Sequence, residues 1–138
     1  FDDHETFPAL CWALLKVNIS ADLAQKLESC RFIYLVCQRI KKSKSSQTII
    51  AGAKLIQRFA MVSFSSSYQV IVQQLSRCAV EKNELAPDCI KTLAALVKFP
   101  ELRTVFELCQ VASIVAKFRD CAQLKEPINE ILAELAYS

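Results

Sequence analysis

The chain has 138 residues, which suits one domain, and 53% of them are hydrophobic, which excludes a disordered chain and permits a sizeable core. Its single glycine, Gly52, excludes every glycine-rich phosphate-binding loop, because those motifs contain several glycines. The net charge of +3 is too small to indicate nucleic-acid binding by itself. No apolar run reaches the ~18 residues that span a bilayer, so we expect no membrane segment.

The first half of the chain predicts four helices. Pro8 suits the first turn of a helix, and Ser20 is placed to cap the next one. The third ends in positive residues, as helix C-termini favour, and the polar stretch 42–47 predicts a loop after it. The fourth has apolar residues at helical spacing. The four expected helices cover 8–17, 21–30, 31–43 and 48–62.

The second half predicts five further helices, separated by polar residues and prolines. Pro100 ends one helix, because it lacks an N–H and pushes Phe99 out of the helical region. Pro127 suits the start of the last helix, and 81–88 predicts a loop. The expected helices cover 68–80, 89–99, 101–109, 111–121 and 128–138.

Two segments also carry a β signal. Residues 31–38 and 68–75 are rich in β-branched and aromatic side chains, which favour strands. Period-two alternation fails within both segments and the flanking sequence is helical, so helix is the prediction that we keep.

The seven cysteines indicate a reducing compartment. Their odd number and irregular spacing argue against a disulfide framework. Because there is no CxxC pair and His4 is the only histidine, we expect no zinc site and no other cofactor. Most of the cysteines stand among apolar residues and are predicted to be small buried side chains. We therefore expect an intracellular protein, cytoplasmic or nuclear.

An internal repeat underlies the helix pattern. A shift of 81 residues places Leu15 on Leu96 and Leu27 on Leu108, and a shift of 39 places Leu96 on Leu135. The period is therefore close to forty, in the range of armadillo and HEAT repeats. Helices this short are marginal alone, so each is expected to gain stability from the helices of its own and the adjacent repeat.

The segment "KTLAALVKFPELRTVFELCQVASIVAKFRDCAQLKEPINEILAELA" resembles an armadillo repeat. In that family a short first helix and an apolar second helix precede a longer third helix rich in small residues and leucine. The resemblance implies an all-α fold, a short right-handed α-solenoid of about three repeats, over a single domain 1–138. Because the chain does not begin with Met, we expect it to be a fragment of a longer protein. An all-α bundle is the alternative fold.

The resemblance also implies a binding role. Third helices of armadillo proteins line a concave face, and peptide-binding members carry a Trp followed four residues later by Asn. Here Lys16 stands four residues after Trp12. Trp12 is either a core residue or a surface anchor for a partner. If the cations on these helices point one way, they suit an acidic or phosphorylated peptide; otherwise they form a solvated face. The candidate binding residues are Trp12, Lys16, Lys54, Arg58, Lys91 and Lys98.

A basic stretch at 39–46 is the second candidate region. It is expected to be a loop that is simply solvated, contacts phosphates, carries a modification or acts as a nuclear-import signal. Its basic residues are Arg39, Lys41, Lys42 and Lys44.

These features predict a non-enzymatic scaffold or interaction module, which binds a peptide or helical segment of a partner protein on its third helices or repeat ends. The alternative is a homodimer, in which an exposed apolar face of the last helix, 128–138, covers its copy. Nucleic-acid binding through the lysines is a weaker prediction, because no aromatic side chains are interleaved with them. No arrangement of a nucleophile with a positioned base points to catalysis.

Overall fold

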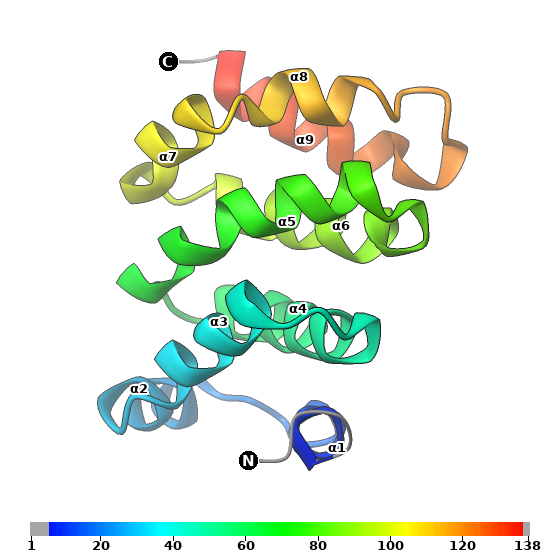
Figure 1. Cartoon of the computed structure of the whole chain (residues 1–138). Helices are drawn as coiled ribbons and strands as arrows, with labels where there is room; N and C mark the ends of the chain where they lie inside the picture. The colour runs from blue at the N-terminus through cyan, green and yellow to red at the C-terminus, as the bar shows by residue number, and fades with distance from the viewer. Residues whose placement is uncertain (1–5, 137–138) are drawn as a thin grey trace. The chain divides into compact units, whose positions relative to one another are not determined.

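The computed structural model describes residues 6–136, and its regular structure within that range is entirely helical (Figure 1). The chain forms two compact units, residues 1–71 (unit 1) and 72–138 (unit 2). Segments 31–38 and 68–75, which carry a β signal, lie mainly in helices α3 and α5, so the helical prediction is confirmed. Within the described range no helix combines the length and the apolar character that crossing a membrane requires.

Unit 1 contains four α-helices and a 3₁₀ turn. Ser20 caps α2 as predicted, since its side-chain oxygen accepts a hydrogen bond from the Leu23 amide at 3.1 Å. Arg31 has a left-handed backbone (φ 66°) and separates α2 from α3. The elements are α1 (Thr6–Leu15), α2 (Ala21–Ser29), α3 (Phe32–Lys42), α4 (Ser46–Ala60) and η1 (Ser66–Tyr68), after which α5 (Gln69–Glu81) begins.

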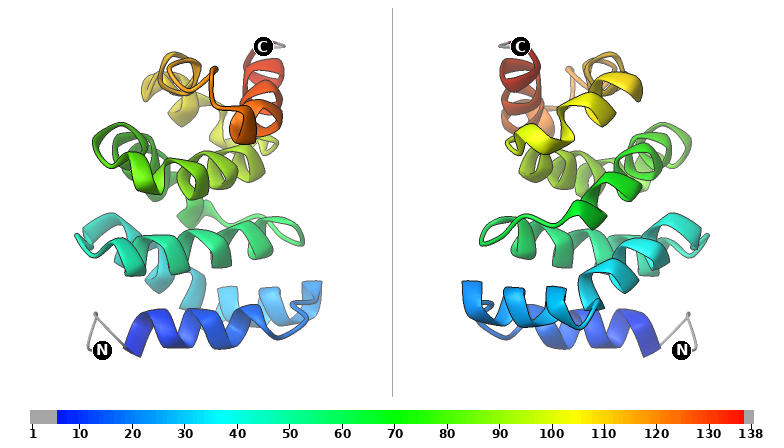
Figure 2. Two further views of the ribbon diagram at one scale, coloured as in Figure 1. Left: turned by 90° about the vertical axis from the view of Figure 1, so that its right-hand side faces the viewer. Right: turned by 90° about the vertical axis from the view of Figure 1, so that its left-hand side faces the viewer.

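Helix α4 is the centre of unit 1, because it packs against both α1 and α3 (Figure 2). A Cβ placed on Gly52 of α4 would lie 2.7 Å from Ile40 Cγ1 and 3.7 Å from Phe7 Cε2. Gly52 therefore lets α3 approach the backbone of α4 closely, whereas the contact with α1 would remain an ordinary one. Phe59 closes the other end of the core, with its ring edge-on to Phe32 at 6.4 Å between centroids.

Unit 2 holds most of α5 and four further α-helices. Phe99 has an extended backbone (φ −83°, ψ 114°) before Pro100, so the predicted break is confirmed. Helix α6 packs against α9, and α8 packs against both α7 and α9. The elements after α5 are η2 (Asn83–Leu85), α6 (Ala86–Val97), η3 (Pro100–Leu102), α7 (Arg103–Leu108), α8 (Val111–Ala116), η4 (Ala122–Leu124) and α9 (Lys125–Ala136).

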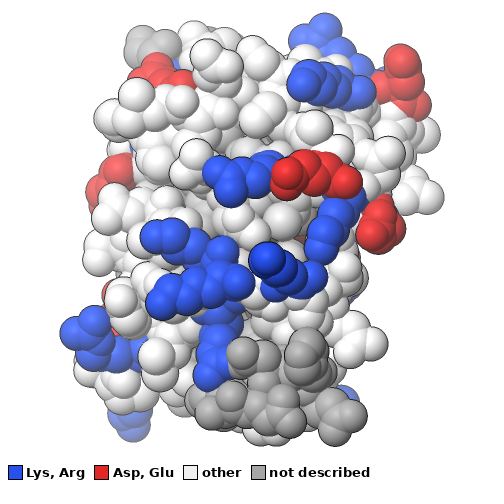
Figure 3. Space-filling model, viewed as in Figure 1, with Lys and Arg blue, Asp and Glu red and all other residues white. Residues whose placement is uncertain are grey.

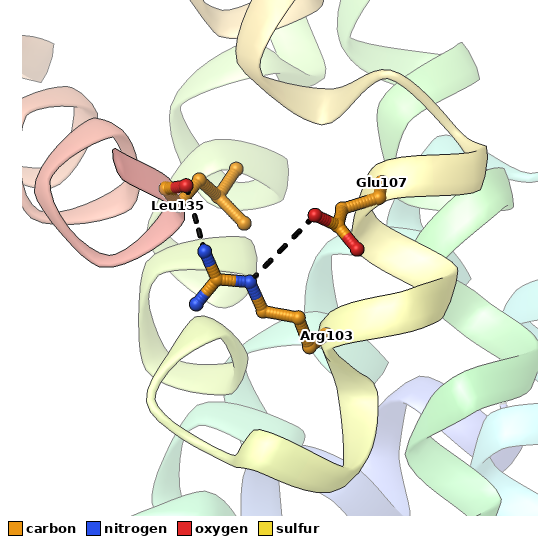
Figure 4. A network of polar contacts seen from close by, with 3 residues as sticks. All are labelled: Arg103, Glu107 and Leu135. Atoms are coloured by element: carbon orange, nitrogen blue, oxygen red, sulfur yellow. Dashed lines mark hydrogen bonds and ion pairs between the residues drawn. The ribbon is translucent and has the colours of Figure 1, made fainter. Parts of the chain in front are cut away.

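One side chain ties α7 to the end of α9 in unit 2 (Figure 4). Arg103 Nη2 donates a hydrogen bond to the Leu135 carbonyl oxygen at 2.7 Å. Its Nε lies 3.9 Å from Glu107 Oε2, an ion pair that is too long to count as a hydrogen bond. The guanidinium therefore donates to a backbone carbonyl in the last turn of α9, where helix carbonyls accept from side chains.

The helix positions agree with the predicted period. Helices α1, α4, α6 and α9 begin at Thr6, Ser46, Ala86 and Lys125, which are 40, 40 and 39 residues apart. Within unit 1 the pair α1 and α4 is in contact, and within unit 2 the pair α6 and α9 is in contact. The same pairing of helices about forty residues apart thus occurs in each unit.

The alignment of Leu27 with Leu108 is wrong. The left-handed residues that follow α2 and α7 are Arg31 and Gln110, which are 79 residues apart rather than 81. The shorter offset places Leu27 on Phe106, which is buried, whereas Leu108 is 77% exposed. A shift of two residues rotates a position by about 200°, nearly to the opposite side of the helix, so the equivalent position changes from exposed to buried.

Several predicted boundaries also change. Segment 86–88, expected in a loop, forms the first turn of α6, where Pro87 is tolerated because the first turn needs no N–H donor. Helix α8 ends at Ala116 rather than at residue 121. Helix α9 begins at Lys125, two residues before Pro127. The basic stretch 39–46 is a loop only at 43–45, since Arg39–Lys42 are the last turn of α3 and Ser46 begins α4.

Candidate functional site

Helix α1 is apolar on every side, which is unusual for a helix with an exposed face. No charged residue occurs from Thr6 to Leu15. Phe7 and Cys11 are buried against the rest of unit 1, whereas Ala9, Trp12 and Ala13 are exposed. A helix that is apolar all round is normally buried on all sides. The exposed side of α1 therefore has the composition of a buried surface, although none of the described residues of unit 1 covers it.

Trp12 is the large side chain on this exposed side. It is 42% exposed, whereas Leu93, with which the repeat aligned it, is 0% exposed. The interpretation of Trp12 as a core residue is therefore wrong. An indole that is half buried and half exposed offers a rigid apolar surface together with an N–H donor, as interface anchors do.

Arg58 joins the C-terminal ends of α1 and α4. Its Nη1 donates to the Leu15 carbonyl at 3.3 Å and its Nη2 donates to the Val17 carbonyl at 3.4 Å. Together with the approach of Phe7 to Gly52, these contacts show that α1 and α4 run in the same direction. Arg58 therefore caps α1, and its hydrogen-bonding capacity is partly used within unit 1.

Exposed side chains surround this joined end. Lys16 and Val17 follow α1, and Met61 and Val62 follow α4; Met61 is 71% exposed. Because Arg58 links the two helix ends, we group these side chains with the exposed side of α1. We define the α1 surface as Ala9, Trp12, Ala13, Lys16, Val17, Met61 and Val62.

The structure brings together only part of the predicted binding set. Trp12 lies in the last turn of α1 and Lys16 directly follows that helix, whose end Arg58 contacts, and Lys54 lies one turn before Arg58 on α4, half-buried. Lys91 and Lys98 belong to unit 2, where both are exposed, and Lys98 Nζ lies 5.4 Å from the centroid of the Phe99 ring.

Met61 and Val62 were missed by sequence reasoning. In the sequence they continue the apolar pattern of α4 and were expected to lie within that helix. The helix instead ends at Ala60, and the two side chains fall in the turn beyond it. The available signal was the Ser-rich stretch that follows, which marks the end of the helix.

The predicted basic loop is mostly helical. Arg39, Lys41 and Lys42 lie on the last turn of α3, and only Lys44 lies in the connection to α4. Lys41, Lys42 and Lys44 are exposed. Arg39 is half-buried, and its guanidinium carbon lies 6.0 Å from the centroid of the Phe7 ring.

The last helix does not present the apolar face that the homodimer prediction requires. The exposed positions of α9 are mainly polar, and Glu126, Glu130 and Glu134 follow one another at four-residue spacing on one side. Charged residues at that spacing form a solvated stripe. Within Lys125–Ala136 the exposed positions therefore give no support to a homodimer through this helix, and residues 137–138 of the predicted face lie outside the described residues.

The cysteines lie mainly in the core. Cys11, Cys37, Cys78 and Cys89 are buried, as predicted for small apolar side chains, and none of the seven forms a disulfide within the described range. Burial raises the pKa of the Cys11, Cys37 and Cys89 thiols to about 12. A thiol that stays protonated is a poor nucleophile, so these side chains suit packing rather than chemistry.

Two other features bear on possible chemistry, namely the grouping of metal-ligating side chains and a surface hollow. Among residues 6–136 no three His, Cys, Asp or Glu side chains are grouped so as to hold a metal ion, and His4 lies outside the described residues. A shallow hollow of 510 Å³ in unit 2 has an apolar lining that includes Val80, Pro87 and Phe118. None of the predicted binding residues lines this hollow.

Comparisons with known proteins give no match: no protein-family model, no curated protein and no solved structure matches this chain. The helix order, the spacing of about forty residues and the exposed surfaces of unit 1 are therefore the observations that bear on function.

Proposed function

We propose that the chain is a non-enzymatic protein-interaction module, and that a helical or extended segment of a partner protein binds the α1 surface. The observation that carries the proposal is the uncharged helix α1, which leaves Trp12 42% exposed. Exposed apolar side chains that occur singly need no explanation, whereas a group of them on one helix side and its neighbouring turn marks an interaction surface.

The composition of the α1 surface suits a protein partner. Trp12 supplies a rigid anchor, and the exposed Met61 supplies a flexible apolar contact that adapts to the shape of a bound segment. Ala9 and Ala13 are small, so a partner backbone can approach the helix between them and Trp12. Lys16 at the edge provides a charge that orients the partner and increases the rate of association.

We further propose that the repeated helices form a short right-handed α-solenoid of about three armadillo-like repeats. The support is the spacing of 40, 40 and 39 residues between the starts of α1, α4, α6 and α9. In repeat proteins each unit contacts only its neighbours, and the result is an elongated particle. Small-angle X-ray scattering that gave a maximum dimension typical of a compact bundle of this mass would contradict the solenoid.

The binding proposal is tested with paired surface variants. Affinity capture from cell extract with the wild-type chain and with Trp12→Ala identifies proteins whose recovery depends on this side chain. We expect Trp12→Ala to weaken the binding of such a protein about 10- to 30-fold in a titration with the purified pair, because central aromatic anchors contribute about 2 kcal/mol.

Leu108→Ala is the matched control, since Leu108 is an exposed apolar side chain of unit 2 outside the α1 surface. It should leave the same affinity unchanged. Equal recovery of every bound protein by the wild-type chain and Trp12→Ala would contradict the proposal. Sedimentation of the purified chain at high concentration identifies a second copy as the occupant if dimerisation is lost in Trp12→Ala alone.

A further inference from the structure

Unit 1 also carries a positive surface that the proposed binding of a partner to the α1 surface does not use. Residues 29–71 contain no Asp or Glu. Within residues 6–71 the carboxylates are Asp22 and Glu28, both on α2. Over the whole of residues 1–71 the sequence has nine Lys and Arg against five Asp and Glu, so unit 1 has an excess of positive charge. The cations of residues 29–71 are Arg31, Arg39, Lys41, Lys42, Lys44, Lys54 and Arg58.

Four of these cations fall within six residues, Arg39, Lys41, Lys42 and Lys44, which we call the basic turn. On the face drawn in Figure 3, Lys and Arg side chains gather next to one another. A helix C-terminus favours a nearby cation, and this explains one or two of the four. Local helix stability does not require the others.

The backbone of the basic turn is held in place. The Ser43 amide donates to the Arg39 carbonyl at 2.9 Å, and the Ser45 amide donates to the Ser43 hydroxyl at 3.0 Å. The hydroxyl of Ser45 in turn caps α4. Ile40, inside the turn, is 0% exposed and packs against Gly52. The cations are therefore carried on an ordered scaffold rather than on a long mobile loop.

The basic turn and the α1 surface lie on different sides of α1. Arg39 lies over the ring of Phe7, which is on the buried side of that helix. Trp12 is five residues further along, which turns its side chain by about 140° from Phe7. A partner segment on Trp12 therefore does not have to contact the basic turn, and the two surfaces can be tested separately.

We propose that the basic turn is a second interaction surface, which binds a carboxylate-rich segment of a protein. Its exposed cations are lysines. A lysine acts as a point charge and attracts a flexible acidic chain without the fixed hydrogen-bond geometry of an arginine. Nucleic acid fits less well, because single-strand binders stack bases on exposed aromatic rings next to their cations. Near the turn, the Phe7 ring is buried, and the Tyr34 ring further back on α3 lies 4.6 Å from the Arg31 guanidinium carbon.

The test uses a labelled peptide of about twelve residues, half of them Glu, titrated with the whole chain at about 50 mM salt. We expect Lys41→Glu/Lys42→Glu/Lys44→Glu to weaken binding about tenfold or more. The neutral variant Lys41→Gln/Lys42→Gln/Lys44→Gln should give an intermediate loss. This variant also controls for unfolding of α3 as the cause of a loss, because it places no negative charge at the C-terminal end of that helix.

The matched control is Lys117→Glu/Arg119→Glu/Lys125→Glu, which changes the net charge equally at three exposed positions of unit 2. It should retain most of the binding, and an equal loss in both charge reversals would overturn the proposal. So would the absence of binding to the wild-type chain. Tighter binding of an oligouridine of the same length, lost in the same variant, would assign the surface to nucleic acid instead. Trp12→Ala should leave peptide binding unchanged, so failure here is distinguishable from failure at the α1 surface.

Discussion

At the scale of single residues, Gly52 shows how one position sets the distance between helices. Helix interiors normally disfavour glycine by about 1 kcal/mol relative to alanine. Here α3 approaches so closely that an added Cβ would lie 2.7 Å from Ile40 Cγ1 and 3.0 Å from Ile40 Cδ1. The β-branched Ile40 is stiff and fully buried, so it has little room to move away.

We expect Gly52→Ala to lower the free energy of unfolding by about 1–2 kcal/mol, because the overpacking of Ile40 outweighs the gain in helix propensity. Urea denaturation of the wild-type chain and the variant measures the difference.

The same substitution in an Ile40→Ala background separates packing from propensity. Removing the Ile40 side chain frees the space, so adding a methyl group at position 52 should then be neutral or stabilising. The nearest remaining contact, 3.7 Å to Phe7 Cε2, is ordinary van der Waals distance. A Gly52→Ala penalty of equal size in both backgrounds would show that Ile40 is not the cause.

At the scale of elements, two arginines stabilise helices other than their own. Arg58 of α4 donates to carbonyls at the end of α1, and Arg103 of α7 donates to a carbonyl at the end of α9. In both cases a guanidinium donates to backbone carbonyl oxygens in or just beyond the last turn of another helix. In each unit, therefore, the last turn of a helix depends on a side chain from a different part of the sequence.

We expect Arg103→Ala to destabilise unit 2 by about 1–2 kcal/mol and to speed amide exchange in the last turn of α9. Hydrogen–deuterium exchange read by mass spectrometry locates the effect.

Glu107→Gln is the matched comparison, and it should change stability by less than about 0.5 kcal/mol. Glu107 is 57% exposed and its carboxylate lies 3.9 Å from Arg103 Nε, so the ion pair is weak. A larger effect of Glu107→Gln than of Arg103→Ala would contradict the expectation that the contact of Arg103 with the Leu135 carbonyl contributes more than the ion pair within α7.

At the scale of the whole molecule, the buried thiols make stability depend on pH. Burial raises the pKa of Cys11, Cys37 and Cys89 from 9.0 to about 12. It also raises the pKa of the Tyr68 hydroxyl, which is 0% exposed. Between pH 9 and pH 12 the unfolded chain loses these protons while the folded chain keeps them, so the folded state binds more protons and its stability falls as pH rises.

We therefore expect the free energy of unfolding to be insensitive to these groups below about pH 8 and to fall above pH 9. The slope is about 1.4 kcal/mol per pH unit for each thiol that ionises only in the unfolded chain. Urea denaturation at a series of pH values measures it.

Cys89→Ala removes one of these groups and should make the alkaline slope shallower. Cys30→Ala is the control for loss of a sulfur atom, because Cys30 is exposed. Stability that stays constant up to pH 11 in the wild-type chain would contradict the expectation.

Local sequence signals predicted the helical class and most helix limits. Ser20 caps α2 as expected, and Pro100 forces the break after α6. The period of about forty also agrees with the helix starts. These features depend on residues close together in the chain, through caps, missing donors and apolar spacing, so a sequence contains the information to predict them.

The candidate site was predicted only in part. Trp12, Lys16 and Arg58 were predicted as binding residues because the repeat placed them on or near third helices, and this role stays a prediction. The hydrogen bonds of Arg58 to Leu15 and Val17, and the exposure of Met61, could not be foreseen. Both depend on the parallel contact of α1 with α4, between residues about forty positions apart.

The sequence by itself determined that the chain is helical, that its helices recur about every forty residues, and that residues 29–71 contain seven cations and no carboxylate. Only the tertiary structure decided which side of α1 stays exposed and that Leu108, unlike Leu27, faces solvent. The reason is that a helix follows from interactions within a few residues, whereas the burial of each of its sides depends on which distant helix packs against it.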